Sequence, residues 1–145
     1  LNAIASLKSN NEQATVFDSY ATKTTPYTPK LTITYPEKQN AIIQLPKTLP
    51  SNVASLILKV DYLGGSALLF QNGKHITDNL YNGTTWHIGL HRFMEGGDIE
   101  LKLQDWNISI TGVAPKLVKE INEKGTVFKA INAVAQYQAI LTITK

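Results

Sequence analysis

The 145-residue chain contains no cysteine and only one arginine, Arg92. Without cysteine the chain has no disulfide, thiolate metal ligand or cysteine nucleophile. The absence of cysteine does not indicate the cellular compartment. A single arginine leaves little means of bidentate contact with phosphates or bases. The lysines are scattered and the net charge is only +3, so we expect no nucleic-acid partner.

Long apolar runs are also missing. No stretch approaches the roughly 20 apolar residues of a membrane-spanning helix, and we expect no membrane partner. The hydrophobic fraction of 43% is nevertheless sufficient for a folded core. The length suits one domain. Because the chain begins at Leu1 and not at methionine, we expect that domain to be a segment of a larger polypeptide.

Short segments of alternating apolar and polar residues dominate the chain, bounded by proline, glycine or asparagine. They occupy residues 31–35, 41–45, 55–62, 67–71, 74–77, 99–103 and 137–144. Asn72-Gly73 separates two of them, and this dipeptide is the strongest short-range signal for a hairpin because both residues tolerate positive φ. About eight short strands with such turns are typical of a β-sandwich. We predict that residues 1–145 form a single all-β sandwich, with a jelly roll as the expected topology.

A few segments depart from the strand pattern. Residues 114–122 predict a short helix, with Pro115 in its first turn and Gly125 just beyond its end. Residues 130–135 fit a helix or a strand equally well. Residues 22–29 are polar and rich in turn formers, which predicts a loop. The sandwich is therefore expected to include one or two short helices.

Residues 79–93, NLYNGTTWHIGLHRF, hold two of the three histidines. His87 and His91 would share a helix face as in the zinc-binding H-E-x-x-H motif, but no glutamate lies between them. On a strand the same spacing separates the Cβ atoms by about 13 Å, too far for one metal ion. Even with His75 as a third ligand, ordinary hydrogen-bonded histidines are the stronger interpretation. We expect neither a metal nor a cofactor.

No other motif selects an active site. The acidic residues show no paired spacing of the kind that glycosidic hydrolysis needs, and there is no G-x-S-x-G elbow. The Gly-Gly pairs at 64–65 and 96–97 lack the lysine and the helix of a phosphate-binding loop. Asp61 is interpreted as a cap of the turn at 64–65. We therefore expect no catalytic residue in this chain.

Residues 79–93 also contain the side chains of a sugar-binding site. Such sites combine an apolar or aromatic wall with a few polar groups that orient the ligand. The candidates are Tyr81, Trp86, His87, Arg92 and, further along the chain, Trp106. The competing interpretation is structural: beside a glycine turn, Trp86 is favoured as a packing residue by about two to one.

Residues 60–74 read VDYLGGSALLFQNGK, and residues 78–90 read DNLYNGTTWHIGL. They resemble the jelly-roll, galactose-binding-like accessory domains of bacterial β-galactosidases and related glycoside hydrolases, whose pattern is roughly D-Y-x-G-D-x-A-x-x-x-x-N-G followed by D-x-x-Y-N-G-x-x-W-x-I-G-L. The residues that fit are Asp61, Tyr62, Gly64, Ala67, Asn72, Gly73, Asp78, Tyr81, Asn82, Gly83, Trp86, Gly89 and Leu90. Gly65 departs from the pattern, which often has aspartate there.

The resemblance implies a non-catalytic domain beside a separate catalytic barrel, in a periplasmic or extracellular bacterial enzyme. Its implied partners are a carbohydrate, such as a galactose-containing glycan, and the catalytic domain of the same polypeptide. The alternative is a structural or protein-interaction domain without sugar binding. A free-standing enzyme is the third hypothesis and ranks last.

Several residues of the matching segment are expected to be structural. Asp61, Asn72-Gly73 and Asn82-Gly83 should hold a corner of the sandwich together, with the two Asn-Gly pairs as turns. Trp86 and Ile88 should place their side chains on the same face of the following strand.

Overall fold

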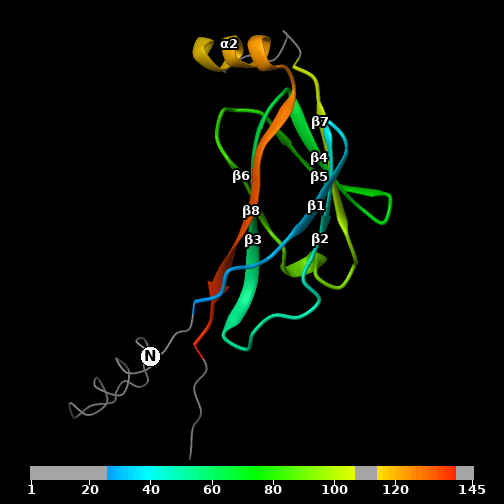
Figure 1. Cartoon of the computed structure of the whole chain (residues 1–145), viewed down its shortest axis with the longest axis vertical. Helices are drawn as coiled ribbons and strands as arrows, with labels where there is room; N and C mark the ends of the chain where they lie inside the picture. The colour runs from blue at the N-terminus through cyan, green and yellow to red at the C-terminus, as the bar shows by residue number, and fades with distance from the viewer. Residues whose placement is uncertain (1–25, 107–113, 140–145) are drawn as a thin grey trace, which may run out of the picture.

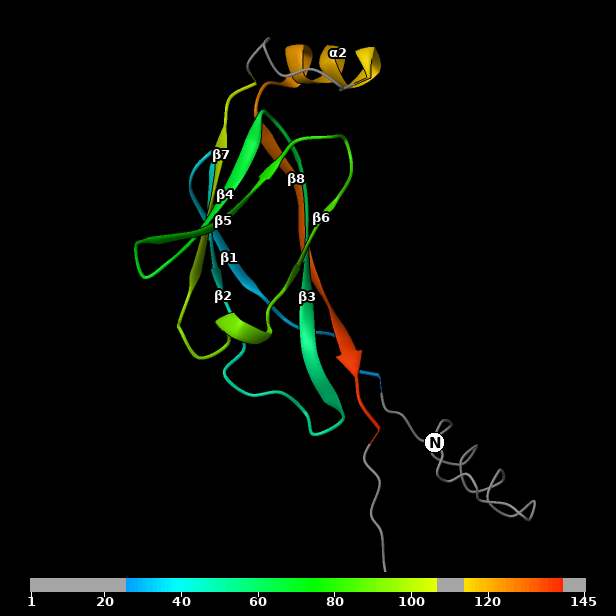
Figure 2. The ribbon, with the colours of Figure 1, turned by 180° about the vertical axis from the view of Figure 1, so that it is seen from behind.

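The computed structural model of the chain describes residues 26–106 and 114–139, which form an all-β sandwich with one α-helix (Figures 1 and 2). A five-stranded antiparallel sheet, in the order β1-β2-β7-β4-β5, faces a three-stranded sheet in the order β6-β3-β8. The predicted all-β sandwich is confirmed.

The five-stranded sheet comprises β1 (Thr32–Glu37), β2 (Asn40–Gln44), β4 (Ser66–Gln71), β5 (Lys74–Leu80) and β7 (Ile99–Gln104). The three-stranded sheet comprises β3 (Val53–Leu63), β6 (Trp86–Gly89) and β8 (Val127–Tyr137). A short 3-10 turn, η1 (His91–Phe93), follows β6, and helix α2 (Pro115–Lys124) precedes β8. Figure 1 shows α2 lying across one end of the sandwich.

The core forms between the sheets because alternate side chains of each strand point inward. In β3 the inward residues Leu56, Leu58, Val60 and Tyr62 are all buried. They meet buried residues of the facing sheet, namely Ala41, Ile43, Ala67, Leu69, Ile99, Leu101 and Leu103. Full burial of such an aliphatic side chain contributes about 1.5–3 kcal/mol, so this layer is the main source of stability.

The strand pairs are nested. β4 pairs with β5, β3 with β6 and β2 with β7, all antiparallel. The same pairs would form if one long hairpin, with the β4–β5 turn at its tip, were rolled up into a sandwich. β1 and β8 add to the outside of β2 and β3. As a result, the connections β1–β2, β3–β4, β5–β6 and β7–β8 all lie at the end of the sandwich that carries α2 (Figure 2).

Both Asn-Gly turns are confirmed. Asn72 and Gly73 have φ values of 54° and 76° and connect β4 directly to β5. Gly83 has a φ of 86°. Beside it, the Asn82 side-chain oxygen accepts hydrogen bonds from the Thr84 backbone N–H at 3.0 Å and from the Thr84 hydroxyl at 2.7 Å. The asparagine oxygen thereby closes the turn locally.

The predicted helix is also confirmed. α2 has Pro115 in its first turn and ends at Gly125, whose φ is 75° and whose N–H donates to the Ile121 carbonyl at 2.7 Å. Ile121 is buried against the sandwich. Within the described part of the chain, no helix has the length and apolar character needed to cross a membrane.

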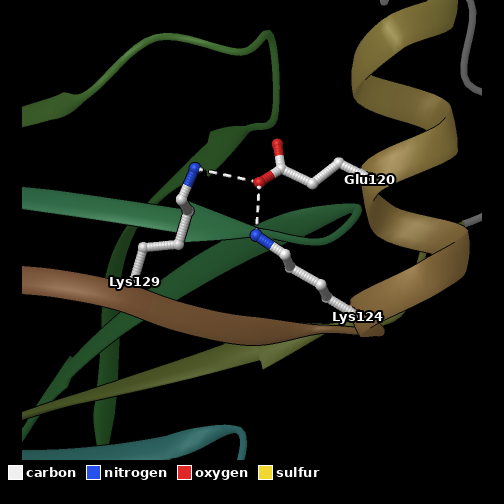
Figure 3. Close-up of polar contacts among 3 residues, drawn as sticks. All are labelled: Glu120, Lys124 and Lys129. Atoms are coloured by element: carbon white, nitrogen blue, oxygen red, sulfur yellow. Dashed lines mark hydrogen bonds and ion pairs between the residues drawn. The ribbon is translucent and has the colours of Figure 1, made fainter.

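One ion-pair cluster joins α2 to β8 (Figure 3). A Glu120 carboxylate oxygen accepts hydrogen bonds from Lys124 at 3.0 Å and from Lys129 of β8 at 3.3 Å. These two ammonium groups, Lys124 first, lower the pKa of Glu120 below its usual value. Because the cluster is exposed to solvent, it stabilises the helix position only slightly.

Some local predictions were wrong or incomplete. The ambiguous segment 130–135 is strand, because it pairs with β3 along most of its length. Of the strand predicted over 137–144, only Tyr137, the last residue of β8, is strand in the described part. Gln138 still donates its backbone N–H to the Asn52 carbonyl at 2.9 Å, but β3 itself begins at Val53. Residues 140–144 of that segment lie outside the described residues, as do 22–25 of the predicted loop.

Asp61 does not cap the turn at 64–65. It lies inside β3, at a register shift between Asp61 and Tyr62 in the pairing with β8. Among the described residues its carboxylate makes no hydrogen bond to that turn. The turn is held instead by the backbone: the Gly65 N–H donates to the Gln104 carbonyl at 2.8 Å. A side chain at Gly65 would collide with the Asp105 carbonyl, so close approach of the end of β7 requires glycine there.

Three glycine-to-alanine substitutions test how α2 is seated. Gly83→Ala should destabilise the fold by about 3 kcal/mol, from left-handed backbone strain and a clash with Leu117 of α2. Gly97→Ala, with a φ of 91° and open space around it, should lose only about 1 kcal/mol. Gly89→Ala should be nearly neutral. Urea denaturation measures the free energy of unfolding of all three variants. Equal losses of stability at Gly83 and Gly97 would mean that the Leu117 side chain moves aside without cost.

Candidate functional site

The aromatic residues proposed for sugar contact are mainly packing residues in the structure. Tyr81 is only 4% exposed, and its ring meets that of Tyr62 edge-on with centroids 5.3 Å apart. A ring buried in this way offers no face to a ligand from solution. Tyr81 therefore belongs to the core at the α2 end of the sandwich.

Trp86 and Trp106 are half-buried and pack against the core. Trp86 shares the inward side of β6 with the buried Ile88, as the alternation predicted. His87 points the other way and is exposed, with its Nδ1 3.1 Å from the Thr85 carbonyl oxygen. Both tryptophan side chains thus mainly pack against the core.

Arg92 is exposed on η1, with its guanidinium carbon 4.8 Å from the centroid of the adjacent phenylalanine ring. Trp86 is paired with Val60, whereas Leu90 donates its N–H to the Leu56 carbonyl at 2.9 Å. Four residues of strand correspond to about 13 Å. Trp86 and Arg92, two of the predicted sugar-contact residues, consequently lie at separate points along β3.

A different set of side chains gathers on the solvent side of the five-stranded sheet. Strand pairing arranges them in cross-strand rows. The first row is Thr34, Ile42, Glu100, Phe70 and His75; the second is Asn40, Lys102, Leu68 and Asp78; the third is Gln104, Ser66 and Leu80. We call these residues the outer face. Five strands about 4.8 Å apart make it about 19 Å wide.

Phe70 is at the centre of the outer face. Its half-buried ring lies 5.1 Å from the Lys102 ammonium and 5.3 Å from the His75 ring centroid. Lys102 is 3.9 Å from a Glu100 carboxylate oxygen, and His75 is 3.6 Å from Asp78. Hydrogen-bond donors and acceptors therefore flank one aromatic ring on both sides. This arrangement suits a ligand with an apolar face and a polar rim.

Two more apolar side chains extend this surface. Ile42 and Leu68 are half-buried, while their chain neighbours Ile43 and Leu69 are fully buried in the core. Because side chains alternate between the faces of a strand, Ile42 and Leu68 point away from the core. Leu68 and Phe70 form an apolar strip along β4, and Ile42 lies on β2 beyond Glu100 of β7.

A hollow of about 390 Å³ adjoins the outer face, within the size range of small-molecule sites. It is lined by Glu37, Lys38, Gln39, Asn40, Lys102 and Leu103. The β1–β2 turn that walls it is fixed by Gln39, whose side chain donates to the Leu103 carbonyl at 3.0 Å and whose own carbonyl accepts from the Leu103 N–H at 2.8 Å. The hollow is thus part of the ordered sheet edge.

Asn40, shared by the hollow and the outer face, contains an unsatisfied polar atom. Its side-chain oxygen is buried and has no hydrogen-bond partner among the described residues. Leaving such an acceptor unsatisfied costs about 1–3 kcal/mol. The position therefore favours any group that brings a donor into the hollow.

The strongest pKa shift lies away from this surface. The Tyr62 hydroxyl donates to the Asn79 backbone carbonyl at 3.0 Å and accepts from the Asn79 side-chain amide at 2.8 Å. Burial raises the pKa of Tyr62 to about 12, against the smaller opposing effect of the Asn79 hydrogen bond. Burial also raises the pKa of Tyr81. Both phenols stay protonated, and both side chains pack in the core.

Sequence reasoning missed the outer face, although its signal was present. The alternation of residues 99–103 places Glu100 and Lys102 opposite the three buried aliphatic residues. It does not say that Phe70 and His75, from another hairpin, stand beside them. Among the described residues, histidine, aspartate and glutamate form no cluster of three or more that suits a metal ion.

The chain matches no protein-family model and no curated protein. A functional conclusion therefore depends on the geometry of the outer face and the hollow, together with the sequence of residues 60–93.

The Tyr62 pKa predicts how stability depends on alkaline pH. A phenol with an unfolded pKa of about 10 and a folded value of about 12 holds its proton more tightly in the folded state. Its contribution to stability is intact below about pH 10 and is lost as the pH rises toward about 12. Urea denaturation across this range should show a steeper loss for the wild type than for Tyr62→Phe. If stability fell equally with pH in both proteins, the pKa of Tyr62 would be the same in the folded and unfolded states, and the expectation would be wrong.

A second substitution separates packing from ligand contact at Trp86. Trp86→Ala should lower the free energy of unfolding by about 2 kcal/mol, less than for a fully buried tryptophan. His87→Ala, the exposed neighbour, is the control and should stay within about 0.5 kcal/mol of the wild type. Both values come from urea denaturation. A Trp86→Ala variant as stable as the wild type would return this ring to the candidates for ligand contact.

Proposed function

We propose that this chain is a non-catalytic accessory β-sandwich of a carbohydrate-active enzyme, and that it binds carbohydrate on the outer face. The observation that carries the proposal is the partly exposed Phe70 ring, with the Lys102 ammonium over it and the His75 ring beside it, each next to a carboxylate. No other described part of the molecule combines an outward aromatic ring with so many polar partners.

The chemistry of a sugar fits this surface. A pyranose has an apolar face of C–H groups that packs on an aromatic ring, and equatorial hydroxyls that both donate and accept hydrogen bonds. Glu100 and Asp78 supply acceptors around Phe70, and Lys102 supplies donors. The outer face is shallow and has one stacking ring. We expect dissociation constants between about 1 mM and 1 μM.

Two further observations support the assignment. The nested strand pairs agree with a jelly roll, the topology of the accessory domains that residues 60–93 resemble. In that family the catalytic barrel is a separate domain, so we propose the same polypeptide's catalytic domain as a partner and a periplasmic or extracellular location. A galactose-containing glycan is the proposed ligand.

The other side of the molecule favours a second role. On the solvent side of the three-stranded sheet, Ile57 lies between Gly89 of β6 and Val134 of β8. Ile57 is half-buried and Val134 is 37% exposed. This apolar row supports packing of the sandwich against a neighbouring domain, the role that remains if the chain binds no sugar.

Phe70→Ala tests sugar binding. Removing a stacking ring worth about 0.5–1.5 kcal/mol should weaken binding of a galactose-containing oligosaccharide by up to about tenfold. Calorimetry on the best ligands from a glycan-array screen measures the change. Tyr35→Ala is the matched control, because that ring is 52% exposed but faces Phe128 of β8.

Two results would contradict the proposal. Equal affinity of Phe70→Ala and wild type would remove the outer face as the binding surface. A wild-type protein that binds no glycan at millimolar concentration would leave only the packing role.

A further inference from the structure

The hollow and the apolar strip are parts of one continuous surface. Asn40 and Lys102 line the hollow and also form a pair of the second row of the outer face. Lys102 lies between the two parts: its ammonium is 5.1 Å from the Phe70 ring centroid, and its side chain also lines the hollow. A ligand on Phe70 therefore has direct access to the hollow.

One side of the hollow is formed by the β1–β2 turn. The Lys38 ammonium reaches the end of α2, where a methyl group on Gly125 would stand 3.2 Å from it. A glycan chain that extends from the outer face into the hollow therefore meets this turn.

The polar groups of the hollow suit a ligand that both donates and accepts hydrogen bonds. The buried Asn40 oxygen is an acceptor with no partner among the described residues, and a hydroxyl that reached it would satisfy it. Lys38 and Lys102 are cationic donors and Glu37 is an anionic acceptor, which leaves a net charge of +1 on the wall. The Gln39 amide is already engaged with Leu103 and holds the turn.

We propose that the hollow binds the terminal sugar ring of a glycan whose following rings lie across the outer face. The Asn40 side-chain oxygen accepts a hydrogen bond from a hydroxyl of the terminal ring. Lys38 and Lys102 donate to other oxygens of that ring. Phe70 then stacks on a following ring, so the domain recognises chain ends. This inference rests on the proposed function.

Two substitutions in the full chain separate the two parts of the site. Asn40→Leu removes the acceptor at similar volume, and Phe70→Ala removes the stacking ring. Galactose and β-1,4-linked galactotetraose serve as probes, with affinities from calorimetry or NMR titration. Asn40→Leu should weaken binding of both probes by about tenfold, as for loss of one buried hydrogen bond. Phe70→Ala should weaken only the tetraose. Asn132→Leu, the same substitution at an exposed position of β8 in the other sheet, is the control and should change neither.

The possible results are distinguishable. If Asn40→Leu keeps wild-type affinity while Phe70→Ala loses the tetraose, the inference is wrong and the proposed function stands. If Phe70→Ala loses galactose as strongly as Asn40→Leu, the ring itself holds the terminal sugar, and the inference is again wrong. If the wild type binds neither probe nor any other glycan, both fail. Should Asn40→Leu not fold, Lys38→Ala replaces it, with weaker binding of galactose expected and unchanged affinity contradicting the inference.

Discussion

The register of β3 in the centre of its sheet is the constraint on which the rest of the structure depends. With β8 on one side and β6 on the other, alternate residues of β3 form one wall of the core. A slip of one residue would move Lys59 and Asp61 into that core and turn Leu58 and Val60 toward solvent. Burying the two charges would cost far more free energy than any surface contact contributes. The register is therefore specified strongly, and the positions of β6 and α2 follow from it.

The same rule produces the outer face on the opposite sheet. Ile99, Leu101 and Leu103 point inward, so Glu100 and Lys102 must point outward. The chemistry of the candidate site is consequently placed on the solvent side of a sheet that the core holds rigid. Rows of this kind need no loop to position them. The unsatisfied Asn40 oxygen at the edge of the face is the one place in the described structure where a buried side-chain polar atom lacks a partner.

The α2 end of the sandwich is packed by close backbone approaches. Gly65 allows the end of β7 to lie against the β3–β4 turn, and Gly83 allows Leu117 of α2 to sit on the β5–β6 loop. Tyr81 and Tyr62 fill the space beneath. This explains why Tyr81, which looked like a ligand residue in the sequence, is structural: its ring helps to close this end.

Local signals in the sequence determined most of the strands, the Asn72-Gly73 hairpin and the helix between Pro115 and Gly125, because periodicity and turn chemistry act over a few residues. Tertiary structure decided that residues 130–135 are strand, since only pairing with β3 distinguishes the two states. It also decided that Trp86 and Trp106 pack inward and that Phe70, Lys102 and His75 meet. Alternation tells which residues share a face of one strand. Which strands become neighbours is settled by burial of the whole core, and no short segment encodes that.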